Sequence, residues 1–402
     1  MRSMQLRKWH ANLSNLKTAS ITDRLASLGS DRWAVHFESR RRVNAGEDII
    51  ELTIGEPDIP TPGHLLDVAN SSMRAGRTRY AGGKGEPILL KAVADKYSTR
   101  TGRQIDPNQV LAFPGTQAAL TITMMSLVEA GEAVLVPDPY YATYEGVVQA
   151  AGAEFIPVPM SADNGFHLTA EQLEAAVTPH SKVLLLNSPH NPTGAVLTAD
   201  EIRAIGEVCK KHNLWIVSDE VYEPLIYKGG FASSFNMTEY ADRTIAMASI
   251  SKSHAAPGFR SGWAVGPSWA MDKIQSVSEA ILFGGQPFIA DMTAHALNHP
   301  DGTSHEMGQN YRRRIALLME AFAGSKLIPL EPAAGMFMLI DVSSTGLVGA
   351  DFAMKLLDNG VSVMPGSSFG SQCEKFIRLS LTVDNDKLKT AAERINSFAN
   401  SL

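Results

Sequence analysis

A lysine among small hydroxyl residues is the first feature of this chain that could do chemistry. Lys252 stands in Ser249-Ile250-Ser251-Lys252-Ser253, directly after the apolar run 245–248, which we expect to be a buried strand. An ammonium group in such a place must be solvated, paired, or converted into an imine with a carbonyl compound. Conversion needs an amine that its surroundings partly deprotonate. A lysine between serines is also typical of a protein surface, so the residue alone leaves both interpretations open.

Two polar clusters follow apolar runs earlier in the chain. Pro114-Gly115-Thr116-Gln117 opens a helix predicted over 118–128, where free backbone N–H groups and the helix dipole favour a phosphate. A simple capped helix start explains this cluster equally well. Asp138-Pro139-Tyr140-Tyr141 follows the run 133–136, and its rings can either stack on a flat ligand or belong to the core or an interface.

Two later clusters are more specific. The stretch Asn187-Ser188-Pro189-His190-Asn191-Pro192-Thr193-Gly194 contains two prolines in four residues, which predict a rigid turn that holds Asn191 in place. The stretch Ser218-Asp219-Glu220-Val221-Tyr222 places a carboxylate at the end of the apolar run 214–217. A buried aspartate there needs a cationic or donor partner, whereas an exposed one could cap a helix.

The order and spacing of these clusters resemble the class I/II aminotransferases of fold type I, the pyridoxal-phosphate-dependent group that includes aspartate, alanine and aromatic aminotransferases. The resemblance runs from Gly55-Glu56-Pro57-Asp58 to Arg378. Its most specific parts are Asn-Pro-Thr-Gly, Ser-Asp-Glu-Val-Tyr, and Ser-x-Ser-Lys followed by Gly-Phe-Arg-x-Gly. It implies transfer of the amino group of an L-amino acid to a 2-oxo acid by a ping-pong mechanism through a lysine aldimine. The implied cofactor is pyridoxal 5'-phosphate, and no metal is expected.

The resemblance also implies roles for single residues. The catalytic residues would be Lys252 as the imine-forming lysine and base, Asp219 as the partner of the cofactor's pyridine nitrogen, and Tyr222 as a hydrogen-bond partner of the cofactor's phenolic oxygen. Asn191 would bind the same phenolic oxygen. The other implied cofactor-binding residues are Tyr80, Gly115, Thr116, Gln117, Tyr141, Ser249 and Arg260. The implied substrate-binding residues are Gly55, Asn191 and Arg378. Tyr80 matches a tyrosine that reaches the neighbouring subunit's cofactor, which implies a homodimer with shared active sites.

Two positions bear on substrate choice. Some aspartate-specific relatives carry a lysine where this chain has Gln117, so the neutral residue does not support a preference for aspartate. The stretch Phe283-Gly284-Gly285-Gln286-Pro287 lies where relatives shape the side-chain pocket, and its residue types predict a roomy, partly apolar site. The amino donor and the acceptor remain open.

The elements that must position these residues form a repeating pattern. Seven short apolar runs alternate with helical segments between residues 64 and 298, and they are 110–113, 133–136, 154–158, 183–186, 214–217, 245–248 and 262–265. Continuous apolar runs separated by helices predict an α/β fold whose mostly parallel, mixed seven-stranded sheet is covered by helices on both faces. Ligands bind outside the carboxyl ends of such strands, where the polar clusters stand.

The two ends of the chain do not follow this alternation, and together they predict a smaller α+β domain. A helix is predicted over 21–43 and a strand over 49–54. After residue 298 we expect helices over 307–323, 351–358 and 386–398 and strands over 335–340, 361–364 and 376–380. The predicted domains are therefore 1–60 (an N-terminal arm and part of the small domain), 61–299 (the large cofactor-binding domain) and 300–402 (the C-terminal small domain).

Composition excludes several function classes. The chain has 402 residues, 44% of them hydrophobic and 19% charged, with a formal net charge of -6 and no dominant basic run, so neither nucleic acid nor an anionic membrane is an expected partner. Neither a membrane span nor a secretory signal is predicted. The two distant cysteines predict a reducing, cytoplasmic location.

Two other functions are alternatives to transamination. A carbon-sulfur β-lyase of the same fold would need the same lysine, aspartate and arginine, so the sequence leaves it as an alternative. A non-catalytic ligand-sensing relative would carry a DNA-binding winged helix ahead of the fold. The roughly 50 residues before Gly55 are too few and too neutral for such a domain.

Overall fold

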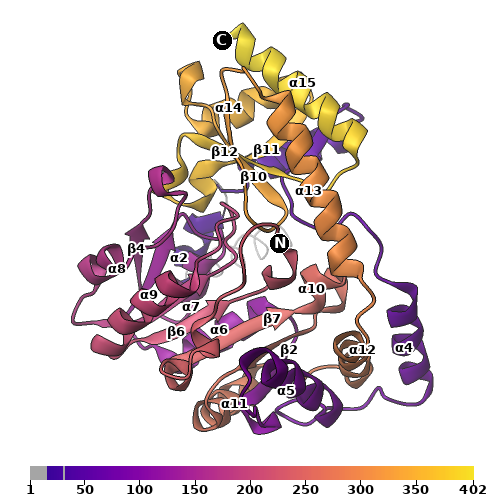
Figure 1. Cartoon of the computed structure of the whole chain (residues 1–402), viewed down its shortest axis with the longest axis vertical. Helices are drawn as coiled ribbons and strands as arrows, with labels where there is room; N and C mark the ends of the chain where they lie inside the picture. The colour runs from indigo at the N-terminus through magenta and orange to yellow at the C-terminus, as the bar shows by residue number, and fades with distance from the viewer. Residues whose placement is uncertain (1–15, 30–31) are drawn as a thin grey trace, which may run out of the picture.

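The computed structural model describes residues 16–29 and 32–402, and its larger sheet has seven strands (Figure 1). The strand order is β2-β8-β7-β6-β5-β3-β4. The strands are β2 (Val110–Phe113), β3 (Ala133–Asp138), β4 (Glu154–Pro159), β5 (Ser181–Asn187), β6 (Trp215–Asp219), β7 (Thr244–Ser249) and β8 (Gly262–Val265). β8 is antiparallel to both of its neighbours, and the remaining pairs are parallel. Every predicted apolar run is thus a strand of one mixed, mostly parallel sheet, which confirms the predicted fold class.

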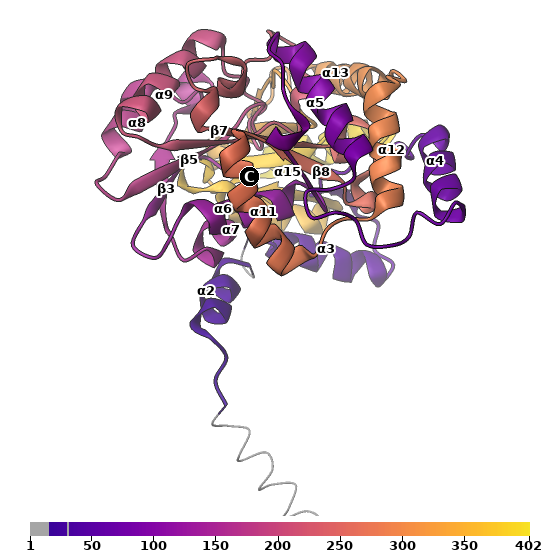
Figure 2. The ribbon, with the colours of Figure 1, turned by 90° about the horizontal axis from the view of Figure 1, so that it is seen from below.

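Helices cover both faces of this sheet because successive side chains of each strand point to opposite sides (Figure 2). In β7, Ile245 and Met247 pack with α6 (Thr116–Leu127), α7 (Tyr144–Ala150) and α11 (Ser268–Leu282). Ala246 and Ala248 pack on the other face with α4 (Gly63–Arg74), α5 (Pro87–Thr101) and α12 (Pro287–Asn298). The rest of that face is covered by α8 (Ala170–Ala176) and α9 (Ala199–Lys211). A sheet that is dry on both faces explains why the strands read as unbroken apolar runs.

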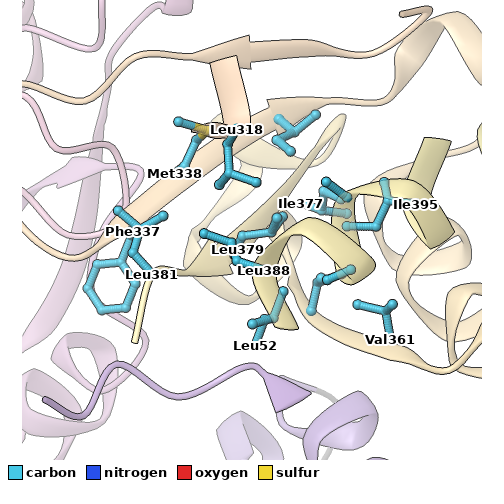
Figure 3. Packing of buried hydrophobic residues seen from close by; sticks show 14 of the residues in the cluster. Leu52, Leu318, Phe337, Met338, Val361, Ile377, Leu379, Leu381, Leu388 and Ile395 are labelled. Carbon is cyan, nitrogen blue, oxygen red and sulfur yellow. The ribbon is translucent and has the colours of Figure 1, made fainter. Parts of the chain in front are cut away.

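The second sheet joins the start of the chain to its end. Its five strands lie in the order β1 (Ile50–Leu52), β11 (Val361–Pro365), β12 (Phe376–Ser380), β10 (Phe337–Asp341) and β9 (Ile328–Leu330). The helices beside it are α3 (Ala34–Asn44), α13 (Thr303–Ala321), α14 (Gly349–Leu356) and α15 (Asn385–Ser401). Leu52 packs in one core with Leu318, Ile377 and Ile395 (Figure 3). Residues separated by more than 250 positions therefore stabilise one small unit.

The helices agree with the predictions except near the N-terminus. The single helix predicted over 21–43 is wrong, since the structure has α2 (Ser20–Gly29) and α3 as separate helices. α2 ends at Gly29, and glycine is a poor helix former. Trp33, which precedes α3, has φ -106° and ψ 5°, outside the helical range. The predicted N-terminal arm lies, up to residue 15, outside the described residues. In the described part of the chain, no helix is both long and apolar enough to cross a membrane.

Candidate active site

A cavity of about 450 Å³ lies where the carboxyl ends of the central strands of the large sheet meet the small sheet. Asn187, Asp219 and Ser249 line it from the ends of β5, β6 and β7, and Phe337 and Arg378 line it from β10 and β12. The predicted site residues that line it are Gly55, Thr116, Gln117, Tyr141, Asn191, Asp219, Tyr222, Ser249, Lys252, Arg260 and Arg378. The tertiary structure thus brings together side chains that the sequence spreads over more than 300 positions.

Lys252 is held in this cavity by the short helix α10 (Ile250–Ser253), which begins directly after β7. Its Nζ donates a hydrogen bond of 2.6 Å to the carbonyl oxygen of Gly55. Burial lowers the pKa of Lys252 to about 8, against the opposing pull of the Glu56 carboxylate. Part of the amine is therefore neutral near physiological pH, as a nucleophile or base requires. The interpretation as a solvated surface lysine does not hold.

Asp219 is buried at the end of β6, and its carboxylate is held by two donors. The hydroxyl of Tyr144 donates to Oδ2 at 2.8 Å, and the backbone N–H of Val221 donates to Oδ1 at 3.3 Å. Burial raises the pKa of Asp219 to about 6, while the Tyr144 hydrogen bond acts in the opposite direction. The carboxylate is ionised at neutral pH and can pair with a protonated ring nitrogen. It does not cap an α-helix, because the chain continues into a turn and a 3₁₀ helix at 223–225.

Asparagine side chains tie the loops after β5 and β6 together. Asn187 donates from Nδ2 to the carbonyl oxygen of Asp219 at 2.9 Å and accepts from the backbone N–H of Asn191 at 2.8 Å. Asn191 then donates from Nδ2 to the hydroxyl of Tyr222 at 3.4 Å. The predicted rigid turn around Asn191 is therefore anchored by Asn187, whose positioning role the sequence analysis missed. Its place at the last position of a buried strand was the available signal.

Arg378 is the most deeply buried cation of the cavity, with 3% of its surface exposed. Its Nη1 donates to Oδ1 of Asn191 at 3.0 Å and its Nη2 to the carbonyl oxygen of Thr53 at 2.6 Å. The guanidinium lies between the rings of Phe337 and Phe369, 4.0 and 4.4 Å from their centroids. Burial lowers its pKa to about 10, so it stays charged at neutral pH. Its buried Nε has no hydrogen-bond partner among the described residues, so this N–H is free to donate to an anion.

The other end of the cavity has the features of a phosphate site. Gly115, with φ 86°, precedes α6, and a Cβ there would lie 2.3 Å from Nη2 of Arg260. The Oγ1 of Thr116 is buried without a partner among the described residues. Backbone N–H groups at the start of α6, the Thr116 hydroxyl and the Arg260 guanidinium suit a phosphate. Together with the unpaired Nε of Arg378, they fit a phosphorylated cofactor and a substrate carboxylate in one cavity.

Tyr80, which the resemblance assigns to the neighbouring subunit's cofactor, lies away from the cavity of its own chain. Its surface is 86% exposed, and its ring packs edge-on against Phe283 at a centroid distance of 5.0 Å. Phe283 is 68% exposed. Neither residue lines the cavity of its own chain, so the expectation that the stretch from Phe283 shapes the pocket is not met within one chain.

Several lining residues were not predicted. Tyr144 stands three positions after Tyr141 in the same aromatic stretch, and their rings meet edge-on at 5.6 Å, so the stretch was a usable signal. Phe337 reads as an ordinary core residue of a strand, and Phe369 ends the short 3₁₀ helix Gly366–Phe369, which has no recognisable sequence pattern. Trp33, Ile54, Glu56 and Leu120 also line the cavity.

Comparisons with known proteins point to one family. The family described as aminotransferase class I and II matches residues 47–395. Arginine–pyruvate transaminase AruH of Pseudomonas aeruginosa is 39% identical over 382 residues, which cover 94% of this chain and 97% of that protein. An aspartate aminotransferase of Geobacillus stearothermophilus is 31% identical over 404 residues, covering 98% and 99%. Among solved structures, the aspartate aminotransferase from Thermus thermophilus with maleate superposes with a TM-score of 0.90 at 29% identity, covering 96% of this chain and 100% of that chain.

Proposed function

We propose a role for each residue of the cavity on one premise: this chain belongs to the aminotransferase class I and II family. It is a transaminase that depends on pyridoxal 5'-phosphate and acts on an amino acid and a 2-oxo acid. The family alone does not assign a donor, an acceptor, an assembly or the work of single side chains. Those assignments are the proposal.

Lys252 moves the proton at the substrate Cα. When bound, the cofactor supplies a carbonyl carbon that takes up the amino group of one substrate and gives it to another. The pKa of Lys252, which burial lowers to about 8, leaves some neutral amine to accept a proton at neutral pH. The carbonyl oxygen of Gly55, 2.6 Å from Nζ, holds the amine inside the cavity.

Asp219 holds a proton on the ring nitrogen of the cofactor. A buried carboxylate that is ionised above about pH 6 is the partner that a protonated nitrogen needs. Asn191 and Tyr222 would donate to the phenolic oxygen of the cofactor, Tyr141 would stack on its ring, and the start of α6 would bind its phosphate. The buried, unpaired Oγ1 of Thr116 supports that last assignment.

Arg378 binds the α-carboxylate of both substrates. Phe337 and Phe369 fix the plane of its guanidinium, and Asn191 and Thr53 take two of its donors. The unpaired Nε is the observation that carries this assignment. A planar, pre-oriented guanidinium suits a carboxylate better than a flexible ammonium does.

The preferred donor is L-arginine and the preferred acceptor is pyruvate. Among the described lining residues, the cations are Lys252, Arg260 and Arg378, each with a role at the amine, the phosphate or the α-carboxylate. No cation of the cavity wall is therefore left to bind a second carboxylate on the side chain of a dicarboxylic substrate, and Gln117 is neutral. Glu56 adds a carboxylate to the cavity wall, which favours a cationic side chain. The transaminase that shares 39% identity with this chain carries arginine and pyruvate in its name.

A comparison of donors tests the substrate assignment. The protein loaded with pyridoxal 5'-phosphate is mixed with pyruvate and either L-arginine or L-aspartate, and the alanine formed is measured. We expect kcat/KM for arginine to exceed that for aspartate at least tenfold, about 1.4 kcal/mol. A faster reaction with aspartate would refute the donor assignment. Pyruvate and a thiol released from a cysteine conjugate without any oxo acid would favour lyase chemistry.

The assembly belongs to the same proposal: a homodimer in which Tyr80 reaches the phosphate site of the partner. Support comes from the exposed pair of Tyr80 and Phe283, since large apolar side chains on a surface often mark interfaces. Lys252→Ala and Tyr80→Ala proteins, unfolded and refolded together, test it. Hybrid dimers would carry one intact site, so activity and cofactor affinity should exceed those of either parent. No gain on mixing would contradict shared sites.

Two further predictions remain proposals. The domain division is 1–60 and 300–402 for the small domain with its arm, and 61–299 for the large domain. It is supported by the two sheets, because β1 pairs with β11 and not with the large sheet. We also propose a cytoplasmic location, for which the buried free thiols of Cys209 and Cys373 give support.

A further inference from the structure

The wall behind the cofactor cavity has two functional sides. From the end of β6 into the turn that follows, Asp219 and Tyr222 line the front cavity, whereas Glu220 and Glu223 line a second cavity of about 730 Å³ behind it. Helix α5 forms part of the far side of this rear cavity through Arg100. The rear cavity therefore shares one strip of backbone with the site of chemistry.

A buried ion pair forms part of the wall of the rear cavity. Nη1 of Arg100 donates to Oε2 of Glu220 at 2.8 Å, and the side chains are 12% and 1% exposed. The hydroxyls of Ser218 and Ser233 donate to the other carboxylate oxygen, the first at 3.2 Å. The Arg100 guanidinium also stacks on the ring of Tyr97 at 4.1 Å. Glu220 is thus a fully satisfied buried carboxylate with a pre-oriented cation.

Glu220 directly follows Asp219, so two buried carboxylates occupy adjacent positions of one turn. Buried like charges this close disfavour each other unless one is compensated. We propose that Arg100 and Glu220 are positioning residues for the cofactor site, in which the guanidinium compensates the charge of Glu220 so that Asp219 stays ionised beside the cofactor ring. This inference rests on the role proposed above for Asp219.

The electrostatics of Asp219 are consistent with this arrangement. After burial, which raises its pKa most, the neighbouring charge of Glu220 raises the pKa of Asp219 further, and Lys252 lowers it. The other titratable groups that act on Asp219 are the hydroxyls of Tyr141, Tyr144 and Tyr222. Glu220 itself faces Arg100 from α5, with Tyr97 on the same helix. Arg100 is the only cation that the described residues place in an ion pair with Glu220.

Electrostatic compensation and a merely structural bond predict different shifts in the pKa of Asp219 for the two single variants. Arg100→Gln leaves Glu220 uncompensated, so Asp219 should become harder to ionise. Glu220→Gln removes the repelling charge and leaves a cation nearby, so Asp219 should become easier to ionise. The Arg100→Gln/Glu220→Gln double variant should lie near the wild type. A merely structural bond would shift the pKa of Asp219 in the same direction in both single variants.

The test measures binding of pyridoxamine 5'-phosphate to the apo protein between pH 4 and 9, which needs neither turnover nor a known substrate. Affinity should fall as the pH drops through the midpoint of Asp219, because its protonated carboxyl cannot pair with the ring nitrogen. The midpoint should move up by about one pH unit in Arg100→Gln and down by about one in Glu220→Gln. Asp219→Asn is the control, and it should keep only the pH dependence of the ligand phosphate, which also titrates at about pH 6.

The outcomes separate the two proposals. If Asp219→Asn has the same pH profile as the wild type, the proposed role of Asp219 is wrong and the inference on the pair falls with it. If that control behaves as expected but the midpoints of the two single variants move in the same direction or not at all, only the inference on Arg100 and Glu220 is overturned. If Arg100→Gln does not fold, Glu220→Gln decides alone: a downward shift supports compensation, and any other result overturns it.

Discussion

The hydroxyl of Tyr144 offers the sharpest single-atom test of the cofactor site. It donates at 2.8 Å to Oδ2 of Asp219, and Tyr144 is 2% exposed. Burial holds the pKa of Tyr144 well above its usual range, so the group remains a donor at every accessible pH. Tyr144→Phe removes this one oxygen and keeps the ring, which packs edge-on against Tyr141.

The expected size of the effect follows from the charge of the acceptor. A hydrogen bond to an ionised group contributes about 1.5–3 kcal/mol. Since one pH unit corresponds to about 1.4 kcal/mol, the loss should raise the pKa of Asp219 by about one to two units. From a starting value of about 6, the carboxyl would then be between half and nine-tenths protonated at pH 7. Affinity for the cofactor should fall about two- to tenfold at pH 7 and little at pH 9.

The assay is the dissociation constant of pyridoxamine 5'-phosphate as a function of pH, with Tyr227→Phe as the matched control. The hydroxyl of Tyr227 donates to the backbone carbonyl of Gly335, so its removal breaks a bond to a neutral acceptor. The control should lower stability without moving the midpoint. A Tyr144→Phe midpoint equal to that of the wild type would refute the claim that this hydroxyl stabilises the ionised carboxylate.

Four further predictions follow from the same geometry. Lys252→Ala should lower the transamination rate at least about a thousandfold and show no covalent cofactor by mass spectrometry after borohydride reduction, and turnover near the wild-type rate would contradict its role. Arg378→Lys should raise KM for the amino acid about tenfold or more in initial-rate assays, because a bidentate contact is lost, whereas an unchanged KM would exclude it as the carboxylate site. Gln117→Lys should raise kcat/KM for L-aspartate relative to L-arginine, and no change in that ratio would place the distal group elsewhere. In the apo protein, ionised Asp219 destabilises the fold by up to about 3 kcal/mol as the pH rises from 4 past 6, so urea unfolding should show Asp219→Asn gaining stability over wild type at pH 8 but not at pH 4.

The large sheet could be predicted because each strand has a local signature. The apolar runs are continuous, since both faces are covered, and helical segments separate them. The small sheet was harder. β9 has three residues, Ile328-Pro329-Leu330, and a proline at the sheet edge hides its strand character. The break between α2 and α3 was missed because apolar residues on both sides were read as one helix.

Local stretches of sequence were enough to identify the reactive groups of the site and the strand ends at which they stand. The lysine after β7, the aspartate at the end of β6 and the asparagine turn after β5 could be assigned to one edge, because parallel strands bring their carboxyl ends together. The local stretches around Lys252, Asp219 and Asn191 were sufficient for that.

The pKa values and orientations of these groups depend on contacts between distant parts of the chain. Arg378 owes its fixed plane to Phe337 and Phe369, and Glu220 owes its compensation to Arg100, 120 positions earlier in the chain. No local pattern indicates such pairs. The reason is physical: burial and the distance between charges set a pKa, and both depend on which distant segments pack together.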